Sequence, residues 1–257
     1  MADWSIGELI NWRIGKLENL GKKLSDWIEN KVTMAKAKGV VLGLSGGIDS
    51  AVVAVLCKKV FPKHTLALVM PCHSINKDLE DALELAKKFN IFYKIIDLSE
   101  IYDLFVSVLL DSKEKKASFK LAEENIKPRL RMITLYYFAN KLNYLVIGTG
   151  NKTELMVGYF TKYGDGGADI LPLGNLLKNQ VRELAEYLRI PKKIISKPPS
   201  AGLWKGQTDE EEIGVSYEQL DQYLKIGKLN NRRIKEIIQK KIVLSEHKRS
   251  TPSIPDF

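Results

Sequence analysis

Glycine, serine and one carboxylate are combined in a single short segment of the chain. Its sequence is Gly43-Leu44-Ser45-Gly46-Gly47-Ile48-Asp49-Ser50. Adjacent glycines let backbone N–H groups approach an anion, and the start of a helix adds unpaired N–H donors with a partial positive charge. A carboxylate beside a polyphosphate would repel it unless a cation lay between them. The segment therefore predicts a loop that binds nucleotide phosphates, with Asp49 as a ligand of Mg²⁺.

This segment lacks the lysine of the P-loop pattern G-x-x-x-x-G-K-[ST], so it is a different phosphate-binding loop. Its SGGIDS portion resembles the pyrophosphatase-type loop of ATP pyrophosphatases. Enzymes with that loop cleave ATP between the α and β phosphates and adenylate an acyl or carbonyl oxygen. The alternative is a glycine turn that serves only packing.

A second group of polar residues follows the apolar residues 144–149. Thr149 could hydrogen-bond a phosphate or the edge of an adenine. Glu154 is a second carboxylate, and it could share a cation with Asp49. Because Glu154 also lies at the start of a short helical segment, a helix-capping role is the alternative.

Two further segments are rich in glycine or proline. Residues 158–173 fit neither a strand nor a helix, and they carry Lys162, Asp165 and Asp169. A long loop of this composition in a compact domain is usually functional. Residues 197–212 contain prolines and glycines, and they form a candidate lid.

Basic residues mark two predicted helices. Arg129 and Arg131 lie near the start of the helix predicted for residues 125–140, where basic side chains oppose the helix dipole. Their placement indicates either an anionic ligand or a structural ion pair. Lys178 is carried by an amphipathic helix predicted for residues 175–189.

Apolar strand-like segments alternate with helical segments through the centre of the chain. The predicted strands are residues 40–42, 65–70, 92–97 and 144–149, and the helices are residues 49–60, 78–89, 99–110 and 125–140. This alternation predicts an α/β fold with right-handed crossovers and a doubly wound, Rossmann-like, mostly parallel sheet flanked by helices. Ligands of such sheets bind beyond the carboxyl ends of the strands.

Helical segments flank this centre. Residues 4–37 predict one amphipathic helix or a pair broken at Gly21. Residues 111–124 are polar and lysine-rich, which indicates a mobile connection. Residues 217–225 and 232–246 predict two terminal helices. We therefore expect a single domain over residues 1–257, with a helical cover (1–38), a nucleotide-binding core (39–190), and a lid segment with C-terminal helices (191–257).

The composition of the 257 residues is that of an ordinary globular protein, with 45% hydrophobic residues and a formal net charge of +9. The positive charge favours anionic partners but does not choose among nucleic acids, phosphorylated ligands and membranes. The two cysteines cannot supply a disulfide framework or a four-ligand zinc site, and they fit a reducing cytoplasm. No 18 uncharged apolar residues run together, so no membrane partner is expected.

Six motifs follow one another along the chain: SGGIDS, NIKPRLR, GTGNKTE, GYFTKYGDGGADILPLGNLLK, PPSAGLWKGQTDE and HKR. Together they resemble the ammonia-dependent NAD synthetases over almost the whole chain. The resemblance implies the adenine-nucleotide α-hydrolase-like fold and a reaction in two steps. The carboxylate of nicotinic acid adenine dinucleotide (deamido-NAD) attacks the α-phosphorus of ATP, which gives an acyl-adenylate and pyrophosphate. Ammonia then displaces AMP and forms NAD.

The resemblance also implies a role for each matching residue. ATP would be bound by residues 43–50, Thr149, Lys178 and Ser200, with Lys178 reaching the polyphosphate. Mg²⁺ would be held by Asp49 and Glu154. Deamido-NAD would be bound by Arg129, Lys162, Asp169, His247 and Lys248. The catalytic residues would be Lys178 and one of two aspartates, Asp165 or Asp169, which would bind ammonium and take its proton.

The implied partners are ATP, deamido-NAD and ammonia, either free or delivered by another protein. No fused glutaminase is expected, because neither cysteine has a recognisable nucleophile setting. Family members are homodimers, and the aromatic-rich helix after Asn125 could supply the interface.

One alternative is another enzyme with this loop, such as a tRNA-modifying thiolase or ligase. The missing reactive cysteines and RNA-binding module argue against it, so no nucleic-acid partner is expected. The other alternative is a non-catalytic nucleotide-binding protein.

Overall fold

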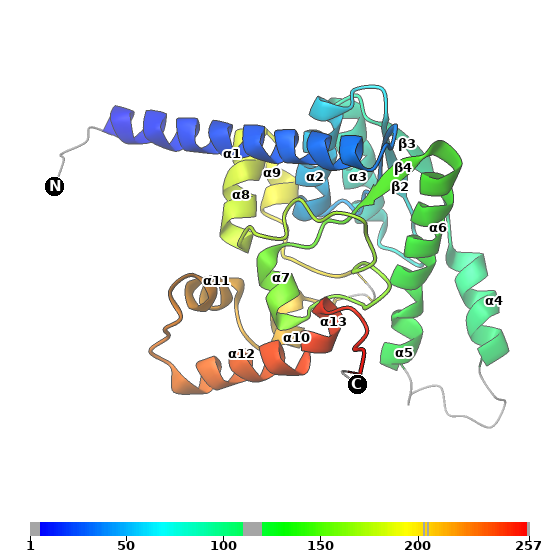
Figure 1. The fold of residues 1–257 in the computed structure, drawn as a ribbon. Helices are drawn as coiled ribbons and strands as arrows, with labels where there is room; N and C mark the ends of the chain where they lie inside the picture. Colours follow the sequence, from blue (N-terminus) through cyan, green and yellow to red (C-terminus); the bar gives the residue numbers. More distant parts are fainter. Residues whose placement is uncertain (1–5, 110–119, 203, 205, 256–257) are drawn as a thin grey trace.

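The computed structural model describes residues 6–109, 120–202, 204 and 206–255, and its side chains from residue 14 onward. A four-stranded sheet lies at the centre, and each neighbouring pair of strands is parallel (Figure 1). The strands are β1 (Gly39–Gly43), β2 (Thr65–Val69), β3 (Phe92–Ile95) and β4 (Tyr144–Ile147), in the order β3-β2-β1-β4. The chain winds outward from β1 to β3 and returns to the other side of β1 at β4. A ligand crevice is expected at the carboxyl ends of β1 and β4, where the winding reverses.

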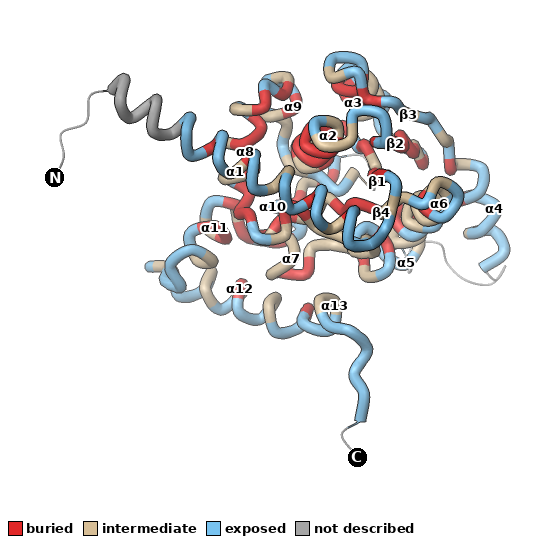
Figure 2. The backbone as a smooth tube through the Cα atoms, turned by 45° about the horizontal axis from the view of Figure 1, so that its top comes forward, coloured by how far each residue is buried: buried red, intermediate tan, exposed pale blue. Residues whose placement is uncertain are grey.

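Helices cover both faces of the sheet, because successive residues of a strand point to opposite sides. Val40 and Leu42 of β1 pack into one apolar cluster, whereas Val41 packs into another. The first cluster contains side chains of α1 (Ile6–Met34), α2 (Ile48–Val60), α3 (Asn76–Lys88), α8 (Lys178–Tyr187) and α9 (Lys192–Ile195). The second contains side chains of α4 (Ser99–Leu109) and α6 (Ile126–Leu142). In Figure 2, α2 and the central strands are accordingly the buried middle of the molecule.

A third apolar cluster lies beyond the sheet, in the C-terminal part of the chain. It joins α7 (Lys152–Val157), α10 (Asp209–Ile213), α11 (Tyr217–Ile226) and α12 (Arg232–Leu244). Leu220 and Ile238 are fully buried in this cluster. Figure 1 shows these helices together with α13 (Glu246–Arg249) on the side of the sheet opposite to α1. This arrangement places a second packed layer beside the carboxyl ends of the strands.

The predicted alternation of strands and helices is confirmed. Of the two alternatives for the N-terminal helical segment, the structure has the single helix: α1 runs through Gly21 and is 29 residues long. A Cβ at Gly21 would lie 3.7 Å from the Tyr187 ring, so the glycine fits a close contact between α1 and α8. Residues 120–124 of the expected connection form a short helix, α5 (Lys120–Glu124). The rest of that connection, residues 110–119, lies outside the described residues.

The proposed division into a cover, a core and a C-terminal segment stays a prediction. Helix α1 does lie across the side of the sheet that α2 and α8 cover (Figure 1). Among the helices that the structure describes, none combines the length and the apolar character needed to cross a bilayer.

Candidate functional site

A cavity of about 540 Å³ opens at the carboxyl ends of the strands. Its wall includes the ends of β1, β2 and β4, residues 43–45 and 47–50, one side of α6, and the segment around residue 200. Both strand-to-helix junctions singled out in the sequence meet here, and Thr149 and Ser200 line the cavity. A pocket of this size at this position in a parallel sheet is typical of a nucleotide site.

Residues 43–50, the phosphate loop, are held partly by their own hydroxyl groups. Ser45 Oγ and Ser50 Oγ lie 3.0 Å apart, and Ser45 Oγ accepts a hydrogen bond from Gly47 N at 3.3 Å. Ser50 Oγ donates to the Gly47 carbonyl at 3.0 Å. Gly47 is the N-cap of α2, and no side chain caps this helix. The loop therefore presents the first N–H groups of a 13-residue helix to the cavity.

One glycine of the phosphate loop also makes a contact that requires glycine. Gly46 has a φ of +80°, and a Cβ there would lie 2.3 Å from the Asp78 carbonyl oxygen. Lys197 Nζ donates to the Gly46 carbonyl at 3.2 Å and pairs with Asp78 and Asp81 of α3. The loop thus rests against α3, and a lysine from a distant segment fastens the two together.

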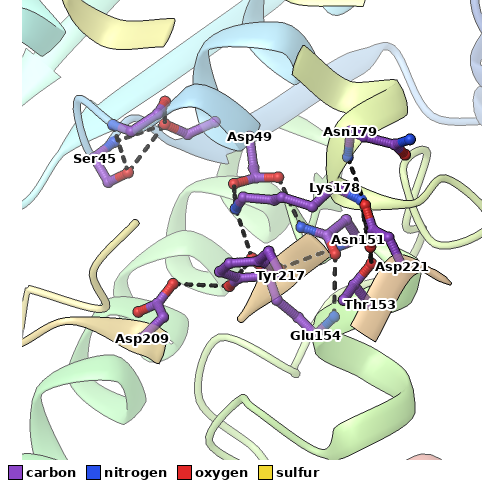
Figure 3. Close-up of polar contacts among 12 residues, drawn as sticks. Ser45, Asp49, Asn151, Thr153, Glu154, Lys178, Asn179, Asp209, Tyr217 and Asp221 are labelled. Carbon is purple, nitrogen blue, oxygen red and sulfur yellow. Dashed lines mark hydrogen bonds and ion pairs between the residues drawn. The ribbon is translucent and has the colours of Figure 1, made fainter. Parts of the chain in front are cut away.

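The ammonium group of Lys178 lies between the two carboxylates that were predicted to share a cation (Figure 3). Lys178 Nζ is 2.6 Å from Asp49 Oδ2 and 2.9 Å from Glu154 Oε1. The lysine side chain is only 3% exposed, and a buried ammonium is costly unless opposite charges compensate it. With both acids ionised, these three residues, the acid–lysine cluster, carry one net negative charge and can accommodate a further cation.

Burial and neighbouring charges shift the pKa values of this cluster. Burial raises the pKa of Glu154 to about 7, although Lys178 acts in the opposite direction. Burial lowers the pKa of Lys178, but Asp49 and Glu154 outweigh it, so the net shift is upward. The lysine is therefore charged at neutral pH, and the cluster is held by ionic attraction in a poorly solvated place.

Glu154 performs the capping role and also faces the lysine, so the two alternatives of the sequence analysis are compatible. Its Oε2 accepts from Asn151 N at 3.1 Å, and Asn151 Oδ1 accepts from Glu154 N at 3.1 Å, which is a capping box at the start of α7. Asn151 Nδ2 also donates to Asp49 Oδ1 at 2.9 Å. One asparagine thereby orients both acids.

Tyr217 of α11 closes the cluster on the side of the C-terminal helices (Figure 3). Its hydroxyl group donates to Asp209 Oδ2 at 2.8 Å and lies 3.3 Å from Glu154 Oε1. Its ring centre is 4.9 Å from Lys178 Nζ, a cation–π contact. Asp209 lines the cavity and is 4% exposed, and its Oδ1 has no hydrogen-bond partner among the described residues.

Asp221, also from α11, fixes the start of the helix that carries Lys178. Asp221 Oδ1 accepts from Thr153 Oγ1 at 2.5 Å, and Oδ2 accepts from Asn179 N at 2.8 Å. Sequence reasoning missed Tyr217, Asp221 and Asn151. For two of them the available signal was helical spacing: Tyr217 and Asp221 are four residues apart and so share one face of α11.

The structure separates the two aspartates that were candidates for the ammonia step. Asp165 lines the cavity, and its Oδ1 accepts from Thr161 N at 2.8 Å. The protein packed around it raises the pKa of Asp165, although the Thr161 N–H favours the charged form. Asp169 is not among the lining residues. Its two oxygens accept from Tyr136 Oη at 3.0 Å and from Val146 N at 2.7 Å, so it fastens its loop to β4 and α6.

The residues predicted to bind deamido-NAD fall into two groups. Lys248 lines the cavity and donates to two main-chain carbonyl groups, each at 2.8 Å. Arg129, Lys162 and His247 lie together outside the cavity wall. Lys162 Nζ donates to the His247 carbonyl, and Arg129 Nη2 donates to the Lys162 carbonyl at 3.4 Å. Their role toward a dinucleotide stays a prediction.

A parallel α/β sheet with a lysine-free serine–glycine loop after its first strand, beside converging acids, defines the class as the adenine-nucleotide α-hydrolase-like fold. The sequence model of the family described as NAD synthase matches residues 20–253. The chain therefore belongs to the NAD synthase family.

Individual relatives match over nearly their whole length. The NH(3)-dependent NAD(+) synthetase of Carboxydothermus hydrogenoformans is 49% identical over 246 residues, which cover 96% of this chain and 98% of the relative. A solved NMN synthetase from Francisella tularensis has a TM-score of 0.88 and 42% identity, and 94% of this chain matches 99% of that chain. The NH3-dependent NAD synthetase of Campylobacter jejuni has a TM-score of 0.76 and 35% identity, with coverages of 93% and 99%.

Proposed function

We propose that this chain joins ammonia to the nicotinate carboxylate of deamido-NAD, with cleavage of ATP to AMP and pyrophosphate, and so forms NAD. Membership of the NAD synthase family and the full-length match to ammonia-dependent relatives support this reaction. A carboxylate cannot be amidated directly at neutral pH, because oxide and hydroxide are very poor leaving groups. Transfer of the adenylyl group to the carboxylate replaces them with AMP, which ammonia can displace.

The observation that carries the proposal is the buried positive charge between Asp49 and Glu154. A place that already holds a cation between carboxylate oxygens has the donor chemistry that Mg²⁺ prefers. When bound to these two acids, Mg²⁺ would neutralise the charge that develops on the departing pyrophosphate. Lys178 would then pair with the polyphosphate and supply the cation that the phosphate loop lacks.

The remaining cavity residues divide the work between the two steps. The N–H groups of the phosphate loop would bind the pyrophosphate portion of ATP, and Thr149 and Ser200 would contact the nucleotide. Ammonium must lose a proton before its nitrogen lone pair can attack. Asp165 would take this proton, because it lines the cavity and its raised pKa favours proton uptake.

We further propose that the chain forms a homodimer through an apolar face that includes α4. This helix exposes Ile101, Leu104, Phe105 and Val108, which recur at helical spacing as a single stripe. Leu104 and Val108 are 67% and 76% exposed, and α4 lies at the rim of the molecule in Figure 2. Tyr137 of the neighbouring α6 is exposed as well. We expect sedimentation velocity to give a dimer, and Leu104→Lys to shift it toward monomer.

The reaction can be tested with ATP, Mg²⁺, ammonium and deamido-NAD, by following AMP and NAD. We expect both products in equal amounts, and no AMP when the dinucleotide is omitted. A non-catalytic nucleotide-binding protein would bind ATP and release no pyrophosphate, which would contradict the proposal. AMP formation that does not depend on deamido-NAD would contradict it as well.

Two parallel assays make the substrate assignment specific. In the first assay, nicotinic acid mononucleotide is supplied instead of deamido-NAD, because one solved neighbour is an NMN synthetase and NMN is the amide of that acid. In the second assay, glutamine is supplied instead of ammonium. We expect the highest kcat/KM with deamido-NAD and ammonium.

We also propose the cytoplasm as the location, which suits the two free cysteines, Cys57 and Cys72.

A further inference from the structure

Arg131 is a partly buried guanidinium in the wall of the cavity, and its hydrogen-bond partners are neutral. Its Nε donates to the Met70 carbonyl at 3.1 Å, and its Nη2 donates to Ser74 Oγ at 3.4 Å. Ion pairs among the described residues do not include Arg131. Burial lowers its pKa, although negative groups nearby, including Asp165, act in the opposite direction. The sequence had left two interpretations of this arginine open, an anionic ligand and a structural ion pair, and no described residue forms such a pair with it.

The cations that line the cavity fall into two groups. Lys178 and Lys197 each pair with two carboxylates. Lys248, like Arg131, donates only to neutral oxygens among the described residues. The loop that carries Asp165 packs against the helix that carries Arg131: a Cβ at Gly164 would lie 3.0 Å from Pro128 Cβ, and one at Gly167 would lie 3.0 Å from Met132 Cγ. Burial lowers the pKa of Arg131 and of Lys248, and the charge of Asp165 acts in the opposite direction on both. With Asp165 ionised, Arg131, Lys248 and Asp165 together carry one net positive charge, whereas the acid–lysine cluster carries one net negative charge when both of its acids are ionised.

A cation held out of water without a counter-charge is costly, so a cavity that keeps one is suited to an anionic ligand. The main-chain carbonyl at the end of β2 fixes the Arg131 side chain, which leaves other N–H groups of its planar fork for a ligand. Such a fork matches the two oxygens of a carboxylate. The neighbouring Asp165 is the residue proposed to deprotonate ammonium. A carboxylate held by Arg131 would therefore lie where the nitrogen nucleophile is generated.

We propose that Arg131 binds the nicotinate carboxylate of deamido-NAD and thereby distinguishes this acid from its amide product. This assignment rests on the proposed function. The amide of NAD carries no charge and presents an NH₂ donor toward the guanidinium, so release of NAD is favoured once amidation is complete. The α-phosphate of ATP is the other anion that could reach this place, and the experiment separates the two.

The test is to compare wild type with Arg131→Met, which removes the charge and keeps an aliphatic side chain. Titration calorimetry would measure binding of deamido-NAD, of NAD, and of ATP with Mg²⁺, each alone. We expect the affinity for deamido-NAD to fall about 10- to 100-fold, because a hydrogen-bonded charge pair is lost. The affinities for NAD and for ATP should change less than about threefold. Arg232→Met is the matched control, because Arg232 is exposed and its ion-pair partner among the described residues is Glu236.

Equal losses for deamido-NAD and NAD, or no loss for either, would overturn the assignment. A loss confined to ATP would also overturn it and would place the α-phosphate at Arg131 instead. Failure of the reaction itself is recognised separately, because it would show in wild type as an absence of NAD formation.

Stability separates this role from a purely structural one. Without ligands, Arg131→Met should melt at the wild-type temperature or above, because the variant no longer holds an uncompensated cation. A lower melting temperature together with unchanged selectivity between acid and amide would mean that Arg131 serves folding. Should Arg131→Met fail to fold, Arg131→Lys provides the test. It keeps the charge but not the fork, and we expect a smaller loss for deamido-NAD with binding of NAD unchanged.

Discussion

The phosphate loop and the acid–lysine cluster are neighbours in the cavity, yet they are built in different ways. The loop is one continuous stretch whose serines bond to each other and to its own backbone. The cluster brings together Asp49 from α2, Glu154 from α7 and Lys178 from α8, and Tyr217 of α11 packs over it. A change in the loop should therefore affect ligand binding first. A change in the cluster should affect the packing of the C-terminal helices as well.

The largest effect is expected for Lys178→Met, which tests the cluster. Asp49 and Glu154 would face each other without the ammonium group that neutralises them. We expect NAD formation to fall about 1,000-fold, and the free energy of unfolding to fall by about 3 kcal/mol. Added Mg²⁺ should stabilise the variant more than wild type, since the vacated space can accept a cation. Urea denaturation with and without Mg²⁺ measures this.

Lys22→Met is the control for that comparison, because Lys22 forms an exposed pair with Asp26 on α1. Its urea denaturation midpoint should match that of wild type, because a fully exposed ion pair contributes little to stability. If Lys178→Met lost activity but kept its full stability, the coupling between the cluster and the fold would be disproved.

Gly46→Ala tests the loop. The substituted Cβ would lie 2.3 Å from the Asp78 carbonyl, at a φ of +80°. We expect destabilisation by about 1–3 kcal/mol and loss of measurable ATP binding, because the backbone must move away from α3. Gly47→Ala is the matched control, since its φ is −90° and the nearest contact of a Cβ would be Ser45 Oγ at 3.3 Å. Equal behaviour of the two variants in equilibrium dialysis would contradict the role assigned to Gly46.

The support of the loop by α3 should depend on pH through Asp81, whose side chain is 1% exposed. Burial raises the pKa of Asp81, but hydrogen bonds and charge from Lys193 and Lys197 outweigh it, so the net shift is downward. An acid with a lowered pKa in the folded state stabilises the fold above its unfolded pKa of about 3.9, and this contribution is lost as pH falls. At pH 7 we expect Asp81→Asn to be about 1–3 kcal/mol less stable than wild type.

The difference between Asp81→Asn and wild type should begin to shrink as pH falls below about 4, where the carboxylate of the unfolded chain is protonated, and it should vanish only when the folded-state carboxylate, whose pKa is lower, is protonated too. Denaturation midpoints measured between pH 3 and pH 7 check this. A difference that stayed constant over that range would show that Asp81 acts through packing rather than through its charge.

The smallest effect is expected for Tyr217→Phe, which removes a single hydroxyl group from the cluster. Asp209 would lose the partner of its Oδ2, and Glu154 would lose a contact at 3.3 Å. We expect a cost of about 1–2 kcal/mol in the free energy of unfolding, with the ring still packed over Lys178. Tyr223→Phe on the same helix is the control. A larger loss of stability for Tyr217→Phe than for Lys178→Met would reverse the ranking and would place the centre of the cluster at Tyr217.

Local patterns were sufficient for much of the fold and for part of the site. Alternating apolar segments predicted the four parallel strands, and the SGGIDS motif spans the turn after β1 and the first residues of α2, as expected. The sequence left open whether α1 is one helix or a pair broken at Gly21, because a glycine in a helical pattern signals either an end or a close contact, and only the packing of α1 against α8 distinguishes them. Asp165 and Asp169 were equivalent in sequence. Only the structure shows that Asp169 is occupied by Tyr136 and Val146 while Asp165 faces the cavity.

The sequence by itself determined where strands and helices form and which loop can bind phosphates, because hydrophobic period, glycine pairs and helix starts act within a few residues. Tertiary structure alone decided which charges pair: Lys178 lies between two acids, whereas Arg131 forms no ion pair with any described residue. The physical reason is that charge compensation depends on distance and burial. Both are set when segments far apart in the chain pack together.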